Sequence, residues 1–334
     1  MVRRLGRGEA PAKAILLGEH AVVYGHPALA VPLFEFRARA QARFDHAHDD
    51  IVIRLDGRNP TVSLSRQPDN PLVLAVRLAL EALGAQPRNL ALRMRSTIPV
   101  AAGLGSGAAV TAALMRAVGD LFGARWDDAD LAARVFEVEK VHHGSPSGID
   151  NTVVTYRRPV YFRKDEPVRF AQVGAELSLL VADTGRPGST RDAVAAVRRR
   201  RETDPAAVMA EMERIGDLVE AASASLAQGD TVTLGRLMDA NHERLRLLGV
   251  SSPELEALVE AARGAGALGA KLTGAGCGGH ALALVSERSA PAVREALLRA
   301  GAARVTLCRV AATVDQGPAV AAVPPVGARG RLRE

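Results

Sequence analysis

One glycine-rich segment has residue types suited to holding a phosphate group. In PVAAGLGSGAAV, residues 99–110, three glycines and a serine lead directly into an apolar stretch of helical length. Such a loop can direct several backbone N–H groups, together with the positive end of the helix dipole, at an anion. The segment therefore predicts a phosphate-binding loop. Its expected members are Pro99, Ala101, Ala102, Gly103, Leu104, Gly105, Ser106, Gly107 and Ala108.

Two other nucleotide-binding motifs fit the same loop less well. It lacks the GK[ST] ending of the Walker loop. It has the spacing of a degenerate GxGxxA dinucleotide fingerprint, but that motif requires an acidic residue about 20 positions further on, after a strand. Here a second predicted helix begins at Asp127 instead. A glycine-rich turn that only packs a helix closely is the remaining alternative.

Two carboxylates in the segment EKVHHGSPSGIDN, residues 139–151, could act on a phosphoryl group and its acceptor. Glu139 lies near the end of a predicted helix, and Asp150 follows a Gly/Ser/Pro turn that could fold it back alongside. In phosphoryl transfer, one such carboxylate can bind Mg²⁺ and the other can take the proton of the acceptor hydroxyl. A solvated helix end followed by a turn would give the same pattern.

Near the N-terminus, the segment KAILLGEHAVVYGHPALA, residues 13–30, is unusual for a loop. Glu19 and His20 stand together between apolar stretches. Buried polar residues need partners, which are either each other or a ligand. An isolated histidine is more often structural, so this pair gives only a weak prediction of a ligand site.

A second glycine cluster, LTGAGCGGH at residues 272–280, lies between a predicted helix and a predicted strand. It could bring backbone close to the same anion or to the adenosine side of a nucleotide. A tight structural hairpin would look the same. The glycines assigned to this loop are Gly274, Gly276 and Gly278.

Other polar clusters give no metal or nucleic-acid signal. His142 and His143 are adjacent, so they cannot share one helix face as the histidines of an HExxH zinc site do. His46 and His48, beside two aspartates, are typical of a polar loop. The arginine run at 198–201 is typical of a solvated helix end.

The elements that must position these segments predict an α+β fold in both halves of the chain. The charged, irregular segment 163–174 separates the halves, which gives domains at 1–172 and 173–315 and a Pro/Gly-rich tail at 316–334. The expected strands are 12–17, 34–44, 51–55, 90–94, 153–162, 177–182, 280–285 and 304–311. The expected helices are 72–83, 108–122, 127–142, 189–201, 205–228, 231–248 and 253–263.

Composition indicates a globular protein that handles small molecules. The 334 residues are 48% hydrophobic, enough to bury two cores, and the net charge of +6 with 3% aromatic residues favours small anionic substrates over nucleic acid. Arginine replaces lysine at most positions, so the chemistry of the few lysines is of interest. These are Lys13, Lys140, Lys164 and Lys271.

Cysteine content and the apolar segments bear on the compartment. Cys277 and Cys308 give no CxxC pair and no disulfide framework, and the first 13 residues lack the apolar core of a signal peptide, so a cytoplasmic enzyme is expected. The uncharged part of the stretch 96–115 is interrupted by proline and glycine, which excludes a membrane span. A homodimer is left open by the sequence.

Taken in order, these segments resemble the GHMP kinase superfamily, and in detail its mevalonate kinases. ADTGRPGSTRDAV and LMDANHERLRLLGVSSPEL add to the similarity, which runs over most of the chain. The resemblance implies two domains, the first like ribosomal protein S5 domain 2 and the second ferredoxin-like, with the active site in the cleft between them. It also implies ATP as co-substrate, Mg²⁺ as cofactor and the C5 hydroxyl of mevalonate as acceptor.

The resemblance assigns roles by motif position. Asp150 would accept the hydroxyl proton, and Lys13 would lie beside the reacting oxygen and the phosphates, where a cation reduces the cost of crowded negative charge. Residues 101–107 would wrap the triphosphate. Glu19, His20 and Thr190 would contact the substrate or the transferred group, and Glu139 and Ser106 would bind the metal.

Two positions depart from the family pattern. The family loop usually ends GLGSSAA, and its second serine gives an oxygen to Mg²⁺, whereas this chain has Gly107 there. The metal site is therefore one side-chain ligand short, and Ser106 or a water could substitute. Cys277 stands where the family often has glycine, at some cost to the loop's backbone freedom.

The same resemblance leaves other functions open. The ATP loop is common to kinases that phosphorylate phosphomevalonate, homoserine or a sugar, and Gly107 would also suit a non-catalytic ATP-binding protein. The segments around Glu19 and Asp150 favour mevalonate, and the retained lysine and carboxylates favour a catalyst.

Overall fold

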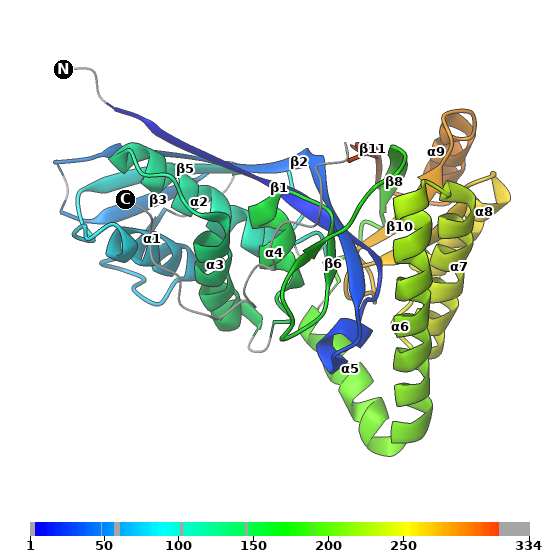
Figure 1. The fold of residues 1–334 in the computed structure, drawn as a ribbon. Helices are drawn as coiled ribbons and strands as arrows, with labels where there is room; N and C mark the ends of the chain where they lie inside the picture. The colour runs from blue at the N-terminus through cyan, green and yellow to red at the C-terminus, as the bar shows by residue number, and fades with distance from the viewer. Residues whose placement is uncertain are drawn as a thin grey trace.

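The computed structural model of the protein describes residues 4–47, 49–56, 61–100, 103–143, 146–188 and 190–313, and within them all side chains except those of residues 142, 143 and 190–192. Two β-sheets, each covered by helices, form two halves, which lie side by side in Figure 1. The tail expected at 316–334 lies outside the described residues.

The first half contains a seven-stranded sheet. Its strands run in the order β4-β3-β5-β2-β6-β7, with β1 paired to β2, and all pairs are antiparallel except β3 with β5. The strands are β1 (Gly6–Leu17), β2 (Ala28–Phe44), β3 (Ile51–Leu55), β4 (Val62–Ser63), β5 (Leu90–Ser96), β6 (Val160–Phe162) and β7 (Arg169–Phe170).

Four helices pack on this sheet. Helix α2 lies directly against β1 and β2, and α1, α3 and α4 pack around α2 (Figure 1). The starts of α1 and α3 are capped locally: Asn70 accepts a hydrogen bond from Leu72 N, and Asp127 accepts hydrogen bonds from Ala129 N and Asp130 N. The helices are α1 (Pro71–Ala82), α2 (Ser106–Phe122), α3 (Asp128–His143) and α4 (Ile149–Tyr156).

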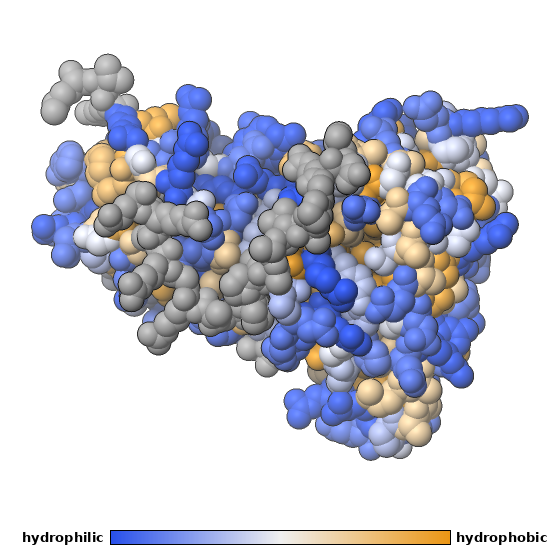
Figure 2. Space-filling view, viewed as in Figure 1, coloured by the Kyte–Doolittle hydropathy of each residue, from blue (hydrophilic) through white to orange (hydrophobic). Residues whose placement is uncertain are grey.

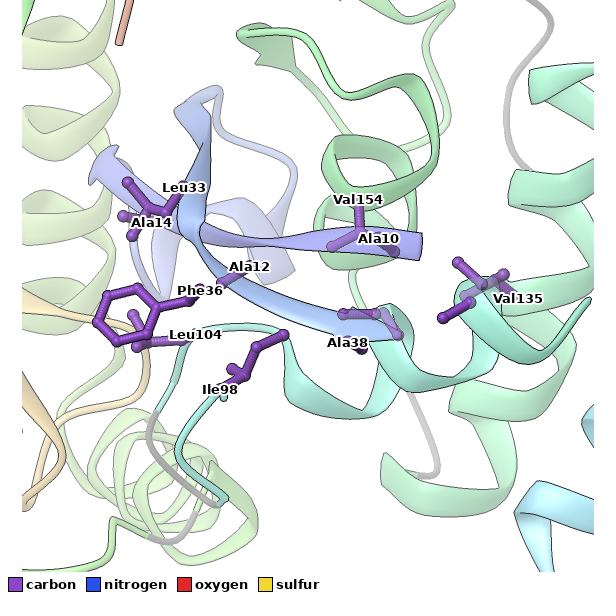
Figure 3. Packing of buried hydrophobic residues seen from close by; sticks show 14 of the residues in the cluster. Ala10, Ala12, Ala14, Leu33, Phe36, Ala38, Ile98, Leu104, Val135 and Val154 are labelled. Atoms are coloured by element: carbon purple, nitrogen blue, oxygen red, sulfur yellow. The ribbon is translucent and has the colours of Figure 1, made fainter. Parts of the chain in front are cut away.

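The alternation expected for β2 buries Phe36, Ala38, Ala40 and Ala42 on one face. Figure 3 shows alanines of β1 and β2 beside larger residues such as Leu33, Phe36 and Leu104. The same alternation would place Phe34 and Phe44 on this face, but both are exposed. Phe44 ends the strand, and Phe34 lies where the pairing of β1 with β2 shifts register, which turns the side chain outward.

One expected strand is wrong. Residues 153–162 were expected to form a strand, but most of this segment is helix α4 or the turn after it, and only β6 is a strand. The helix begins after Gly148, which has φ 98, and it buries both valines between α2, α3 and the sheet. An apolar run of this length cannot be assigned by periodicity when it is buried all round.

The second half has the ferredoxin-like order β-α-β-β-α-β. Its antiparallel sheet runs β11-β8-β10-β9, so the fourth strand lies beside the first and the third beside the second. The strands are β8 (Leu177–Asp183), β9 (Gly269–Thr273), β10 (His280–Val285) and β11 (Arg304–Val310). The helices are α5 (Thr190–Thr203), α6 (Pro205–Gln228), α7 (Thr231–Leu247), α8 (Pro253–Gly264) and α9 (Ala290–Arg299).

Hydrogen bonds between β1 and β9 join the two halves. Thr273 at the end of β9 bonds through its hydroxyl to both the N–H and the C=O of Ile15 in β1.

Hydrophilic residues cover much of the face seen in Figure 2. Among the described residues no helix is long and apolar enough to cross a membrane.

Candidate active site

A cavity of about 290 Å³ lies between the two halves. Its wall from the first half includes residues of β1, the turn after β1, α3 and the start of α4. Its wall from the second half is formed by one face of α5 and by the loop between β9 and β10. The polar and glycine-loop residues that line the cavity include Lys13, Glu19, His20, Gly103, Glu139, Asp150, Arg198, Gly274 and Ala275.

Lys13 and Asp150 form an ion pair at one side of this cavity. The Lys13 Nζ atom lies 2.8 Å from Asp150 Oδ1, and the side chain of Lys13 is 3% exposed while that of Asp150 is 32% exposed. β1 supplies the lysine, and the carboxylate comes from the first turn of α4. The sequence placed both residues at the site, and the structure brings them together with the carboxylate open to the cavity.

The predicted phosphate loop packs directly over this pair. Gly105, with φ 70, precedes α2, and a β-carbon built on it would lie 2.9 Å from Lys13 Cγ and 3.6 Å from Asp150 Oδ2. The first N–H groups of α2 have no intrahelical acceptor because a helix leaves its first turn unpaired. An anion held there would therefore contact the helix N-terminus and the Lys13 ammonium together.

Glu139 lies behind the same loop. An added β-carbon at Gly107 would approach Glu139 Oε1 to 2.8 Å, so the carboxylate lies against the first turn of α2. Burial raises the pKa of Glu139 to about 8, the negative charge of Asp150 adds to the rise, and Lys13 opposes it. Two carboxylates and one ammonium thus share a small, largely buried space.

These donors suit Mg²⁺. A magnesium ion in phosphoryl-transfer sites keeps several waters and needs only one or two carboxylates besides the substrate phosphates. A buried carboxyl whose charge is disfavoured by burial and by a second carboxylate gains from a nearby dication. Among the described residues no group of three or more His, Cys, Asp or Glu side chains gathers into a preformed metal cluster.

His20 connects the two walls of the cavity. Its Nε2–H donates to the carbonyl oxygen of Ala275 at 2.8 Å, which leaves Nδ1 as the acceptor nitrogen. Burial lowers the pKa of His20, so the ring is neutral at physiological pH. Glu19 also lines the cavity, but its two carboxylate oxygens bond to Lys271 and Asn241. Direct contact of Glu19 with a substrate stays a prediction.

The second glycine cluster reaches the cavity at one point. Gly274 packs against Gly103 so closely that a β-carbon on Gly274 would lie 2.6 Å from Gly103 Cα. The other two glycines serve the loop itself: Gly276 lies against the Val250 carbonyl, and Gly278 lies against the carbonyl of Arg186. The two glycine loops, one from each half, therefore meet backbone to backbone.

The other residues expected at the site lie in or beside the phosphate loop and at the start of α5. Ala101 and Ala102 lie outside the described residues, and Thr190 begins α5 with an undescribed side chain. Ser106 is the first residue of α2, and Pro99 and Ala108 flank the loop. Sequence reasoning gave no site role to Arg198 or Lys271. The scarcity of lysine was the available signal for Lys271.

Two family profiles match the chain. GHMP kinases N terminal domain matches residues 70–158, and GHMP kinases C terminal matches residues 218–303. The first match contains the loop before α2, Glu139 and Asp150, and the second contains the loop between β9 and β10. With the cavity between two α+β halves, these matches define the class of protein as an ATP-dependent kinase with the two-domain GHMP fold.

Similar proteins of known activity show which kinases within this class the chain belongs to. The mevalonate kinase of Pyrococcus horikoshii is 39% identical over 300 residues, which cover 84% of this chain and 88% of that protein. That of Thermococcus gammatolerans is 36% identical over 319 residues, covering 89% and 94%. The crystal structure of L. major mevalonate kinase in complex with R-mevalonate superimposes with a TM-score of 0.82 at 27% identity, over 93% of this chain and 98% of that chain. The chain therefore belongs to the mevalonate kinases of the GHMP kinase family.

The raised pKa of Glu139 predicts a pH-dependent stability. A carboxyl whose folded-state pKa is about 8, above its unfolded value of 4.5, stabilises the fold while protonated and loses that contribution as pH rises through about 8. In buffer without Mg²⁺ or nucleotide, Glu139→Gln should therefore raise Tm relative to the parent by several degrees at about pH 9 and by much less at about pH 5.

The measurement is thermal unfolding of both proteins across this pH range. Glu260→Gln, on the exposed side of α8, is the matched control and should show no such trend. A Tm difference for Glu139→Gln that does not change with pH would contradict the burial of an ionising carboxyl at this position.

Proposed function

We propose that the protein transfers the γ-phosphoryl group of ATP to the C5 hydroxyl of mevalonate. The observation that carries this proposal is the Lys13–Asp150 ion pair, which opens to the cavity directly beneath the phosphate loop. Full-length similarity to mevalonate kinases supports mevalonate as the acceptor over phosphomevalonate, homoserine or a sugar.

In this proposal Asp150 receives the proton of the C5 hydroxyl as the oxygen attacks the γ-phosphorus. Its partly exposed carboxylate faces the cavity, and its bond to Lys13 keeps it oriented. Lys13 stabilises the negative charge that gathers on the transferred group. Buried in β1, it supplies a fixed cation with little reorganisation.

The N-terminus of α2 and the loop 103–107 hold the triphosphate by backbone N–H groups. Glu139 on α3 and Ser106 at the start of α2 would hold Mg²⁺, which would neutralise part of the phosphate charge. Gly107 offers no side-chain oxygen, so Ser106 or a water could take the place of the missing serine ligand. His20 and the cavity-facing residues of α5, Val194, Ala195 and Arg198, would form the wall against the acceptor.

Arg198 is proposed to bind the carboxylate of mevalonate. Among the described residues that line the cavity it is the one arginine, and it follows Val194 on the same face of α5. Its present partner is Glu202 at 3.4 Å, in a pair that is exposed on both sides and therefore weak. A substrate carboxylate could replace that partner and bond to both arms of the guanidinium.

The domain limits are part of the proposal. The first sheet ends with β7 at Phe170 and the second begins with β8 at Leu177, which supports a boundary near residue 172.

The compartment is also part of the proposal. Free Cys277 and Cys308 support the cytoplasm as the site of action.

An acceptor panel tests the function. Coupled ADP release should be fastest with mevalonate and at least about 100-fold slower in kcat/KM with phosphomevalonate, homoserine or galactose, since an acceptor that leaves buried polar groups unpaired is strongly rejected. A preference for one of the others would refute the acceptor assignment. ADP release with none of them would favour a non-catalytic role.

Asp150→Asn tests the proton acceptor. It should lower kcat by at least ~100-fold, the lower end of what general-base catalysis contributes, while the affinity for ATP stays close to that of the parent. Asp69→Asn in an exposed turn is the control for the chemical change. Retention of more than about half the parent rate would show that Asp150 is not the base.

Arg198→Gln tests the carboxylate contact. Losing a charge-assisted bond should raise KM for mevalonate about tenfold or more and leave KM for ATP within about twofold. The neighbouring exposed Arg199→Gln, off the cavity, should change neither constant. Equal effects of the two substitutions would remove Arg198 from the binding site.

A further inference from the structure

We propose that the buried ion pair of Glu19 with Lys271 positions the acceptor side of the cavity, by fixing the turn that carries His20 to the second half of the protein. This inference rests on the proposed function for the identity of the acceptor. It gives Glu19 a role different from the direct substrate contact expected from the sequence.

Both oxygens of the Glu19 carboxylate are held by donors from the second half. The ammonium of Lys271, on β9, bonds to Oε1 of Glu19, and the side-chain amide of Asn241, on α7, donates to Oε2 at 3.1 Å. Glu19 is 1% exposed, and Lys271 and Asn241 are fully buried. Lys271 gives a further bond to the carbonyl oxygen of Leu272.

This cluster determines where His20 lies. His20 follows Glu19 directly and has φ 62 and ψ −47, a backbone conformation that a residue with a β-carbon rarely adopts. Such a conformation persists only where the surroundings hold it. The bonds of Glu19 on one side and the bond from His20 to the Ala275 carbonyl on the other supply that restraint.

The charges of the cluster also depend on one another. Burial lowers the pKa of Lys271, Lys13 contributes in the same direction, and Glu19 opposes both. Removing Glu19 alone leaves a buried ammonium near a second cation, and removing Lys271 alone leaves a buried carboxylate. Breaking a buried pair at one end is costly for this reason, whereas replacing both members is often tolerated.

The choice of lysine at 271 fits this role. The chain uses arginine at almost every basic position, and lysine at only four. An ammonium is a compact charge with three donors, which can reach a carboxylate and a carbonyl in a closed space that a planar guanidinium would not fit. A hydrogen bond next to Lys271 also holds strand β9 in place, because Leu272 N–H donates to Nδ1 of His242 on α7.

The test is a double-mutant cycle with Glu19→Gln, Lys271→Met and the double variant. Each single variant should raise KM for mevalonate and lower kcat about tenfold or more, with KM for ATP within about twofold. The double variant should exceed both singles in kcat/KM for mevalonate, because no buried charge is left unpaired. Lys164→Met at an exposed position is the matched control and should behave as the parent.

A conservative variant keeps the test decisive if a single variant fails to fold. Glu19→Asp retains the charge pair but shortens the side chain, so it should keep a cooperative unfolding transition and still raise KM for mevalonate. A lower Tm with KM for mevalonate unchanged in Glu19→Asp and in the double variant would reduce the pair to a structural role and overturn the proposal.

Direct substrate binding by Glu19 gives a different pattern. The double variant would then be no better than Glu19→Gln, which would also overturn the proposal. If the parent prefers another acceptor, the proposed function fails while the cycle, measured with that acceptor, still decides whether the pair positions the site.

Discussion

Lys13 pairs with one carboxylate and lies near a second, beneath the loop that is proposed to hold phosphate. It pairs with Asp150 at 2.8 Å, its charge lowers the cost of ionising Glu139, and its stem lies under Gly105. Burial raises the pKa of Glu139 to about 8, the nearby charge of Asp150 adds to the rise, and the single ammonium of Lys13 offsets it only in part. The site would therefore gain from a further positive charge, which a bound divalent metal ion would supply.

That arrangement requires two halves that meet at fixed distances. Glycines at 103 and 274 let the loops of the two halves touch through their backbones, and Thr273 bonds to both polar groups of Ile15 in β1. The Glu19–Lys271 pair adds a charged link between the turn after β1 and strand β9. The phosphate loop and the acceptor wall are thus anchored to the same two strands, so a displacement of β9 relative to β1 would change both sites together.

The sequence predicted the parts of this site whose signal is local. Glycine spacing before an apolar helix predicted a phosphate loop at 99–110, and residue type with motif position predicted site roles for Lys13, Glu139 and Asp150, three residues that line one cavity. The strand expected at 153–162, which includes Val153 and Val154, is wrong because a short apolar run that is buried on all sides has no period by which a helix can be told from a strand. The partner of Glu19 was not found, since Lys271 lies 252 residues away and no local pattern links the two. Only the rarity of lysine marked it.

Gly107 shows how a departure from the family pattern can be a consequence of packing rather than a loss. A side chain at 107 would begin 2.8 Å from an oxygen of Glu139, so glycine gives the carboxylate the space in which a serine would otherwise stand. Gly107 has no positive φ that demands glycine, and its neighbour Ser106 keeps a hydroxyl on the same helical turn. The missing serine oxygen therefore coincides with the close approach of Glu139 to the N-terminus of α2. A metal bound here would meet a carboxylate already at the first turn of the helix, with water taking the place of the hydroxyl.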